Sequence, residues 1–115
     1  EFRRVLFRSD QKIMESITPT QLKQILEKDP QGFSLIDVRE TEEHHEFNIG
    51  GLLIPLTEIS DNQHLIPRDK PVVLYCRKGI RSMIAIQRLE DKYGFTNLIN
   101  LSGGMDGWMR EIGRS

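Results

Sequence analysis

The residues best suited to chemistry lie in one short stretch, YCRKGIRS, at positions 75–82. It contains Cys76, the single cysteine of the chain, followed by Arg77, Lys78 and Arg81. A cysteine acts as a nucleophile in its thiolate form, which neighbouring cations and a helix N-terminus both favour. The alternative is an inert, buried cysteine beside a solvated basic loop. The clustering of cations behind the only thiol leads us to expect a nucleophile at Cys76.

The flanking segments predict where that thiol lies. PVVLYC, at 71–76, is apolar and rich in β-branched residues, which indicates a buried strand. The apolar spacing over 81–93 indicates a helix, and Gly94 is a typical helix end. In the loop between strand and helix, backbone N–H groups and the helix N-terminus can converge on an anion. Gly79 permits the tight curvature that such a loop needs.

The rest of the chain alternates strands and helices, which is typical of an α/β fold with a parallel sheet covered on both faces. Ligands of such sheets bind beyond the carboxyl ends of the strands, where Cys76 is expected. A Thr18 and Gln21 capping box with Pro19 marks the start of one helix. The other expected elements are strands at 33–38, 52–56 and 96–101 and helices at 41–47, capped by Thr41, at 57–65 and at 105–113.

Size and charge exclude several classes of protein. A chain of 115 residues is the size of one domain. Its net charge of -1 and pI near 6.4 do not fit a nucleic-acid-binding domain, which is typically strongly basic. No apolar run approaches the roughly 20 residues that a membrane-spanning helix needs. We therefore expect a soluble, cytoplasmic domain that binds neither nucleic acid nor membrane.

The first nine residues, EFRRVLFRS, match the translation of a common sequencing-library adapter. We expect residues 1–9 to be foreign and residues 10–115 to form the single domain. A basic amphipathic arm is the alternative. Three arginines and one glutamate fall in the segment, so the rest of the chain carries a net charge of -3. A foreign start would also mean that the natural N-terminus is missing, which is consistent with a domain at the C-terminal end of a longer protein.

Three motifs together resemble one family. CRKGIRS after VVLY, with LIDVRE upstream and LSGGMDGW downstream, is similar to the rhodanese domain over about residues 16–112. The resemblance implies a five-stranded parallel sheet flanked by helices, and transfer of a sulfane sulfur through a cysteine persulfide. The chain also resembles rhodanese domains that follow adenylyltransferases of molybdopterin and thiamine biosynthesis. In those proteins a carrier protein receives the sulfur.

Carried onto this sequence, the resemblance makes Cys76 the residue that accepts sulfur from a donor such as thiosulfate. Three cationic side chains would attract an anionic donor. With no second cysteine, the sulfur must pass to an outside acceptor, such as cyanide, a small thiol, a redox protein or a sulfur-carrier protein. No metal and no organic cofactor is implied. The loop whose backbone would hold the persulfide consists of Arg77, Lys78, Gly79, Ile80 and Arg81.

Two alternatives stay open. Cysteine phosphatases also place a thiolate in a basic loop before a helix, but their signature is Cys-x5-Arg. Here the spacing from Cys76 to Arg81 is Cys-x4-Arg, and Ser82 stands where the phosphatase arginine would be. A phosphoryl group needs a larger cradle than a single sulfur atom. The second alternative is a rhodanese-like interaction module without turnover, although modules of that kind often lack the cysteine.

The segment LIDVRETEEHHEF contributes weaker candidates. Asp37 is expected at a strand end near the site, with Arg39 as a further supporting residue and Ser82 as another in the cysteine loop. We interpret Arg39 and Glu46 as a structural ion pair. His44 and His45 point about 100 degrees apart on a helix, so a solvated face is favoured over a metal site. In the last helix, we expect Met105 and Trp108 to pack in the core or at its rim.

Overall fold

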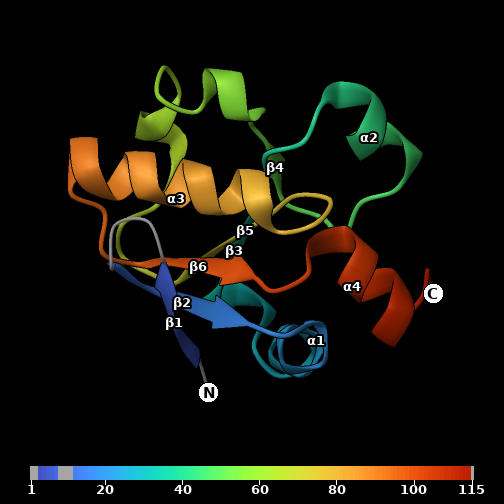
Figure 1. Cartoon of the computed structure of the whole chain (residues 1–115). Coiled ribbons are helices and arrows are strands. Elements are labelled where there is room, and N and C mark those ends of the chain that lie inside the picture. The colour runs from blue at the N-terminus through green and yellow to red at the C-terminus, as the bar shows by residue number, and fades with distance from the viewer. Residues whose placement is uncertain (1–2, 8–11, 115) are drawn as a thin grey trace.

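The computed structural model describes the backbone of residues 3–7 and 12–114 and the side chains of residues 14–114. Its centre is a six-stranded sheet in the order β1-β2-β6-β5-β3-β4 (Figure 1). Five of these strands are parallel, as predicted, and β1 adds an antiparallel edge to β2. The strands are β1 (Arg3–Phe7), β2 (Lys12–Ile17), β3 (Ser34–Asp37), β4 (Leu52–Leu53), β5 (Val72–Tyr75) and β6 (Leu98–Leu101).

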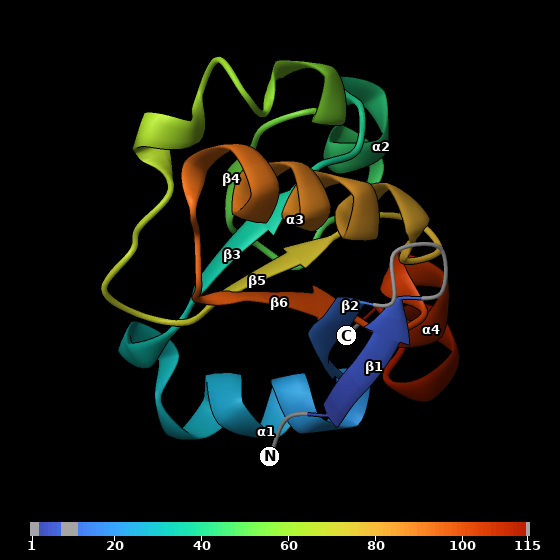
Figure 2. The same ribbon diagram turned by 60° about the vertical axis from the view of Figure 1, so that its left-hand side comes forward.

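Helices cover both faces of this sheet, so the predicted α/β class is confirmed. Helix α3 lies on one face, and α1 and α4 lie side by side on the other (Figures 1 and 2). The arrowheads of β3, β5 and β6 point the same way, so their carboxyl ends share one edge (Figure 2). The helices are α1 (Pro19–Lys28), α2 (Thr41–Glu46), α3 (Ile80–Tyr93) and α4 (Gly104–Glu111).

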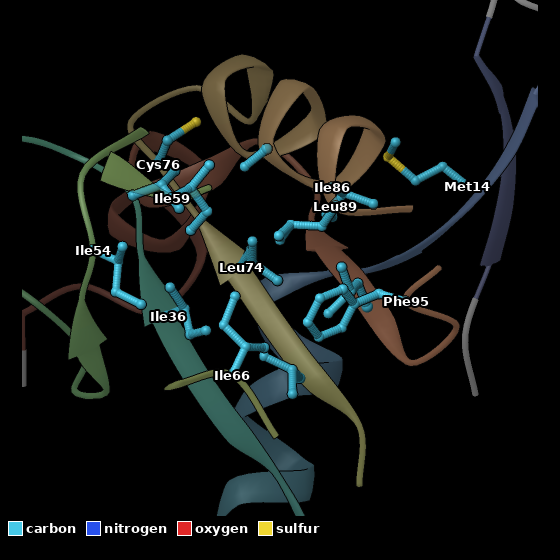
Figure 3. Close-up of a cluster of buried hydrophobic side chains, with 14 residues drawn as sticks. Met14, Ile36, Ile54, Ile59, Ile66, Leu74, Cys76, Ile86, Leu89 and Phe95 are labelled. Atoms are coloured by element: carbon cyan, nitrogen blue, oxygen red, sulfur yellow. The ribbon is translucent and has the colours of Figure 1, made fainter. Parts of the chain in front are cut away.

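Central strand β5 divides the core into two clusters because successive side chains point to opposite faces. Leu74 packs with Leu89 of α3 in the first cluster, which Figure 3 shows. Tyr75 packs in the second cluster with Leu22 of α1 and Trp108 of α4. Every residue of β5 is buried. The strand that leads to the cysteine is therefore held from both sides.

Two predicted helix boundaries are confirmed. The Thr18 hydroxyl accepts the N–H of Gln21, and the Gln21 side chain accepts the N–H of Thr18, which completes the capping box of α1. Gly94 ends α3, the helix that follows the cysteine loop, in a left-handed conformation with φ of 71°. Both signals are local, which is why the sequence reveals them.

Two local predictions are wrong. The segment 57–65 is not one helix but two 3-10 turns, Leu56–Glu58 and Gln63–Leu65. Most backbone bonds of this segment join residues three apart, such as Glu58 N–H to the Pro55 carbonyl and Leu65 N–H to the Asn62 carbonyl, so no continuous α-helix forms. Thr41 does not cap α2 either, since it is the first helical residue. Glu40 is the cap, and it forms the capping box with Glu43.

Candidate active site

Cys76 lies directly after β5, at the carboxyl edge of the sheet, as predicted. Figure 3 shows its sulfur beyond the strand end, beside the first turn of α3. The residue is 1% exposed. It lines a cavity of about 260 Å³ together with four residues of its loop, Arg77, Lys78, Ile80 and Arg81. The thiol is therefore at the bottom of a basic hollow rather than in the sealed core.

Two backbone N–H donors and one hydroxyl meet at the Cys76 sulfur. The backbone N–H of Gly79 donates to Sγ at 3.1 Å and that of Ser82 at 3.3 Å. The Ser82 hydroxyl oxygen lies 3.4 Å from the same atom. Gly79 reaches this arrangement with φ of 93°, a left-handed conformation that favours glycine. The arrangement gives a sulfur anion two backbone N–H donors at one point.

Behind these donors is a buried residue that the sequence analysis did not select. Asn100 of β6 accepts a hydrogen bond from the Ser82 hydroxyl through Oδ1 and donates to the backbone carbonyl of Gly79 at 3.3 Å. It is only 5% exposed. Buried polar side chains are nearly always bonded. Asn100 is the one polar residue inside the apolar strand LINL, and this was the sequence signal that could have identified it.

Helix α4 holds the other side of the loop. The N–H groups of Met105 and Asp106 donate to the carbonyls of Cys76 and Arg77 at 2.8 and 2.9 Å. These bonds require the helix start to lie against the loop backbone. At Gly104 a Cβ atom would come within 2.6 Å of both carbonyl oxygens. Met105, 5% exposed, also packs in the second core cluster, as predicted.

The three loop cations differ in their surroundings. Arg77 and Lys78 are exposed. Arg77 lies 3.5 Å from Asp106 on α4, with both side chains largely in solvent. Arg81 instead donates through Nη1 and Nη2 to the two carboxylate oxygens of Glu43, at 2.9 and 3.0 Å. The positive loop of the sequence is thus partly neutralised by acidic residues from two helices.

The ion pair between Glu43 and Arg81 shifts the pKa of each group so that its charged form is favoured. The hydrogen bonds from Arg81 lower the pKa of Glu43 to about 2, against burial, which acts to raise it. The same bonds raise the pKa of Arg81 above its ordinary value. Both groups are therefore fully ionised at neutral pH.

Glu46 does not have the partner predicted for it, because Arg39 pairs with Asp37 instead. The Arg39 Nε and Nη2 atoms donate to the Asp37 carboxylate, and Nη2 also donates to the carbonyl of Phe47 at 2.7 Å. In the Asp-Val-Arg-x-x-x-Glu count the acidic residue falls on Glu43, three positions before Glu46. The acidic residue of α2 that forms a structural ion pair is therefore Glu43, which pairs with Arg81, rather than Glu46.

Asp37 ends β3 as expected, but its contacts lie away from the cysteine sulfur. It is completely buried between Arg39 and His44, whose Nδ1 lies 2.9 Å from Oδ2 of Asp37. The prediction of a solvated face holds for His45, which is exposed, and is wrong for His44. Asp37 and Arg39 thus fix the start of α2. Within residues 14–114 no group of three His, Cys, Asp or Glu side chains could hold a metal ion.

Tyr75 holds the loop that contains Gly50, which leads into β4. Its hydroxyl donates to the carbonyl of Gly50 at 2.9 Å. Burial, with the Asp37 charge, raises the pKa of Tyr75 well above its ordinary value. Tyr75 therefore stays a neutral hydrogen-bond donor directly before Cys76.

Comparison with known proteins gives the same assignment as the geometry. The family model of the rhodanese-like domain matches residues 18–111. The chain belongs to the rhodanese-like domain family. It is 36% identical over 99 residues to the Bacillus subtilis protein named "Putative sulfurtransferase YtwF", covering 85% of this chain and 93% of that one.

Two further rhodanese relatives extend the comparison. A crystal structure titled as a rhodanese-like domain protein from Staphylococcus aureus is 31% identical, with a TM-score of 0.75, covering 83% of this chain and 91% of that one. The chain is 35% identical over 100 residues to the Mycobacterium tuberculosis protein named "Probable adenylyltransferase/sulfurtransferase MoeZ". That match covers 84% of this chain and 25% of MoeZ, so the rhodanese-like domain corresponds to about a quarter of that longer protein. Among the described residues, no helix is long and apolar enough to cross a membrane.

Proposed function

We propose that this rhodanese-like domain is a sulfurtransferase in which Cys76 carries a sulfane sulfur as a persulfide. The observation that carries the proposal is the convergence of two backbone donors, the Gly79 N–H and the Ser82 N–H, on one sulfur atom. Donors fixed in advance around a developing charge stabilise it without reorganisation. A sulfurtransferase name among the relatives supports the same chemistry.

In the first step, the Cys76 thiolate attacks the outer sulfur of a donor such as thiosulfate. A sulfur–sulfur bond forms at Cys76, the sulfur–sulfur bond of the donor breaks, and sulfite leaves with the bonding electron pair. The persulfide then lies in the loop, where its outer sulfur can accept the same N–H groups. The exposed side chains of Arg77 and Lys78 attract anionic donors to the cavity.

In the second step, a thiophilic acceptor attacks the outer sulfur and restores the Cys76 thiolate. Cyanide, for example, leaves as thiocyanate, and a small thiol leaves as its own persulfide. The sequence offers no second cysteine to resolve the persulfide internally. A sulfur-carrier protein is a further candidate acceptor, which the similarity to MoeZ, named as both adenylyltransferase and sulfurtransferase, supports.

Mass spectrometry after thiosulfate treatment tests the proposal. We expect the peptide that contains Cys76 to gain the mass of one sulfur atom and to lose it on addition of cyanide, with formation of thiocyanate. In Cys76→Ser both the mass gain and the thiocyanate should disappear. A wild-type domain that forms neither product with any sulfane donor would be an interaction module, and full transfer activity in Cys76→Ser would place the chemistry elsewhere.

A further inference from the structure

Arg81, the last residue of the cysteine loop, forms a bidentate ion pair with Glu43. Arg81 follows Cys76 by five positions and lines the same cavity. Its Nη1 and Nη2 atoms donate to the Glu43 carboxylate, at 2.9 and 3.0 Å. The guanidinium fork matches a carboxylate in this geometry, so the pair is stronger than a single contact would be.

The carboxylate of Glu43 is held in this position by its own helix. Oε1, which accepts from Arg81, also accepts the N–H of Glu40 at the start of α2. The Arg81 hydrogen bonds keep the group ionised well into the acid range, as its lowered pKa of about 2 records. Glu43 therefore presents a permanent, fixed negative charge against Arg81, which lines the Cys76 cavity.

A thiosulfate ion would need to compete with this internal carboxylate. Its sulfonate oxygens are ligands of the same type as the Glu43 oxygens, and its two charges are repelled by Glu43. Arg77 faces a carboxylate as well, that of Asp106, although this contact is long and exposed and therefore weak. Within residues 14–114, Lys78 is the loop cation without an ion pair. Anionic donors thus meet a loop whose charge is already largely balanced.

We propose that Glu43 determines donor specificity by competing with anionic donors for Arg81, and that the preferred donors are organic persulfides. This inference rests on the proposed sulfur transfer at Cys76. In an organic persulfide, R–S–SH, the transferable sulfur carries at most one charge and no sulfonate. The Cys76 thiolate attacks the outer sulfur, a new sulfur–sulfur bond forms at Cys76, the sulfur–sulfur bond of the donor breaks, and the thiolate R–S⁻ leaves with the electron pair.

The test compares Glu43→Gln with Glu46→Gln. Each variant removes one negative charge from α2, but Glu46 makes no contact with Arg81. Initial rates are measured with thiosulfate and with the persulfide of 2-mercaptoethanol, whose R group carries no charge, with cyanide as the common acceptor and the rate without protein subtracted. We expect Glu43→Gln to lower the KM for thiosulfate about fivefold, with kcat within about twofold, because the loss of a competing ligand acts on binding. The KM for the persulfide should change less than about twofold, and Glu46→Gln should change neither KM by more than that.

A second variant separates release of Arg81 from a general charge effect. In the double variant Glu43→Gln/Arg81→Gln the gain in thiosulfate affinity should disappear, because the two side chains act as a coupled pair. If Glu43→Gln does not fold, Glu43→Asp serves the same comparison, since its shorter side chain draws the carboxylate away from Arg81.

The outcomes distinguish this inference from the proposed function. If the wild-type domain transfers sulfur through Cys76 but Glu43→Gln matches Glu46→Gln with thiosulfate, the specificity role is wrong and the function stands. A wild-type preference for thiosulfate over the persulfide by kcat/KM would also overturn it. If no donor loads Cys76, both proposals fail.

Discussion

At the scale of single residues, the chemistry at Cys76 depends on a polar pair that no charge argument reveals. The Ser82 hydroxyl lies between the cysteine sulfur and the side-chain oxygen of Asn100. Asn100 in turn holds the carbonyl of Gly79, whose N–H points at the sulfur. The oxygen and the nitrogen of this one buried amide thus hold the Ser82 hydroxyl and the Gly79 carbonyl in place beside the sulfur. Asn100 is therefore a positioning residue for the loop.

Replacement of Ser82 with alanine tests this pair. The change removes the hydroxyl beside the sulfur and leaves the Asn100 oxygen without its partner in a buried place. We expect the free energy of unfolding to fall by about 1–3 kcal/mol, the usual cost of an unsatisfied buried polar group. Transfer activity should fall about tenfold in kcat/KM, because the N–H donors around the reacting sulfur lose the link to Asn100 that holds the loop in position.

Urea denaturation and steady-state kinetics measure the two effects of Ser82→Ala. Ser60→Ala is the control, since Ser60 lies in the turn between the two 3-10 segments, away from the cysteine loop. Alkylation of Cys76 by iodoacetamide at pH 7 provides an independent readout and should be slower in Ser82→Ala alone. Unchanged alkylation and transfer rates would show that the serine has only a structural role.

At the scale of elements, the cysteine loop is held between the starts of two helices. Helix α3 supplies N–H groups to the sulfur, and α4 supplies N–H groups to the carbonyls of Cys76 and Arg77. The close approach of α4 depends on Gly104, whose φ is +60°. The distant segment LSGGMDGW therefore supports the loop through its backbone rather than through a reacting side chain.

Gly104→Ala should disrupt this support. The new methyl group would meet the carbonyl oxygens of Cys76 and Arg77 at 2.6 Å, so the helix start must move. Gly94→Ala is the matched control, because Gly94 is also left-handed, with φ of +71°, and has nothing within 4 Å of the added atom. The control should lose about 1 kcal/mol of stability from the backbone conformation alone.

For Gly104→Ala we expect a loss of about 3 kcal/mol or more, as for other substitutions that force overpacking. Persulfide formation should decrease markedly in this variant and stay normal in the control. Chemical denaturation and the mass-spectrometric assay measure the two properties. Equal effects of the two substitutions would contradict a supporting role for α4.

Elements whose signals are local could be predicted from the sequence, and elements fixed by distant contacts could not. The capping box at Thr18 and the stop at Gly94 need only their own neighbours. The partner of Arg39 was misassigned because Arg39 turns back to Asp37, which the fold buries, while the acid of α2 that forms an ion pair is Glu43, held by Arg81, 38 positions further along. Asn100 was missed for the same reason. Its role appears only when parallel pairing sets β6 beside β5.

At the scale of the whole molecule, five parallel strands and four helices account for the domain, and β1 stands outside that pattern. It pairs antiparallel with the outer edge of β2, in the register Val5 to Met14. The family match begins at residue 18, and the two core clusters of the described side chains consist of residues 14–112. We therefore propose that residues 1–9 are foreign to the domain and that residues 10–115 fold without them.

Two truncated chains test this boundary. A chain that starts at Asp10 loses β1 but keeps β2, whose Ser16 and Ile17 pair with β6. We expect its thermal midpoint to fall by less than about 8 °C, which for a domain of this size corresponds to about 1 kcal/mol. Its transfer activity should stay within about twofold of the full chain, because the Cys76 loop lies at the carboxyl edge of strands that remain paired.

A chain that starts at Thr18 is the contrasting case. It loses β2 and with it Met14 and Ile17, which are 4% and 1% exposed in the two core clusters. Loss of two buried side chains and of the strand beside β6 should unfold the domain, since each buried side chain of this kind contributes about 2–5 kcal/mol. Circular dichroism and thermal melts distinguish the two chains. If the chain from Asp10 unfolds as readily as the chain from Thr18, β1 is an integral strand and the boundary at residue 10 is wrong.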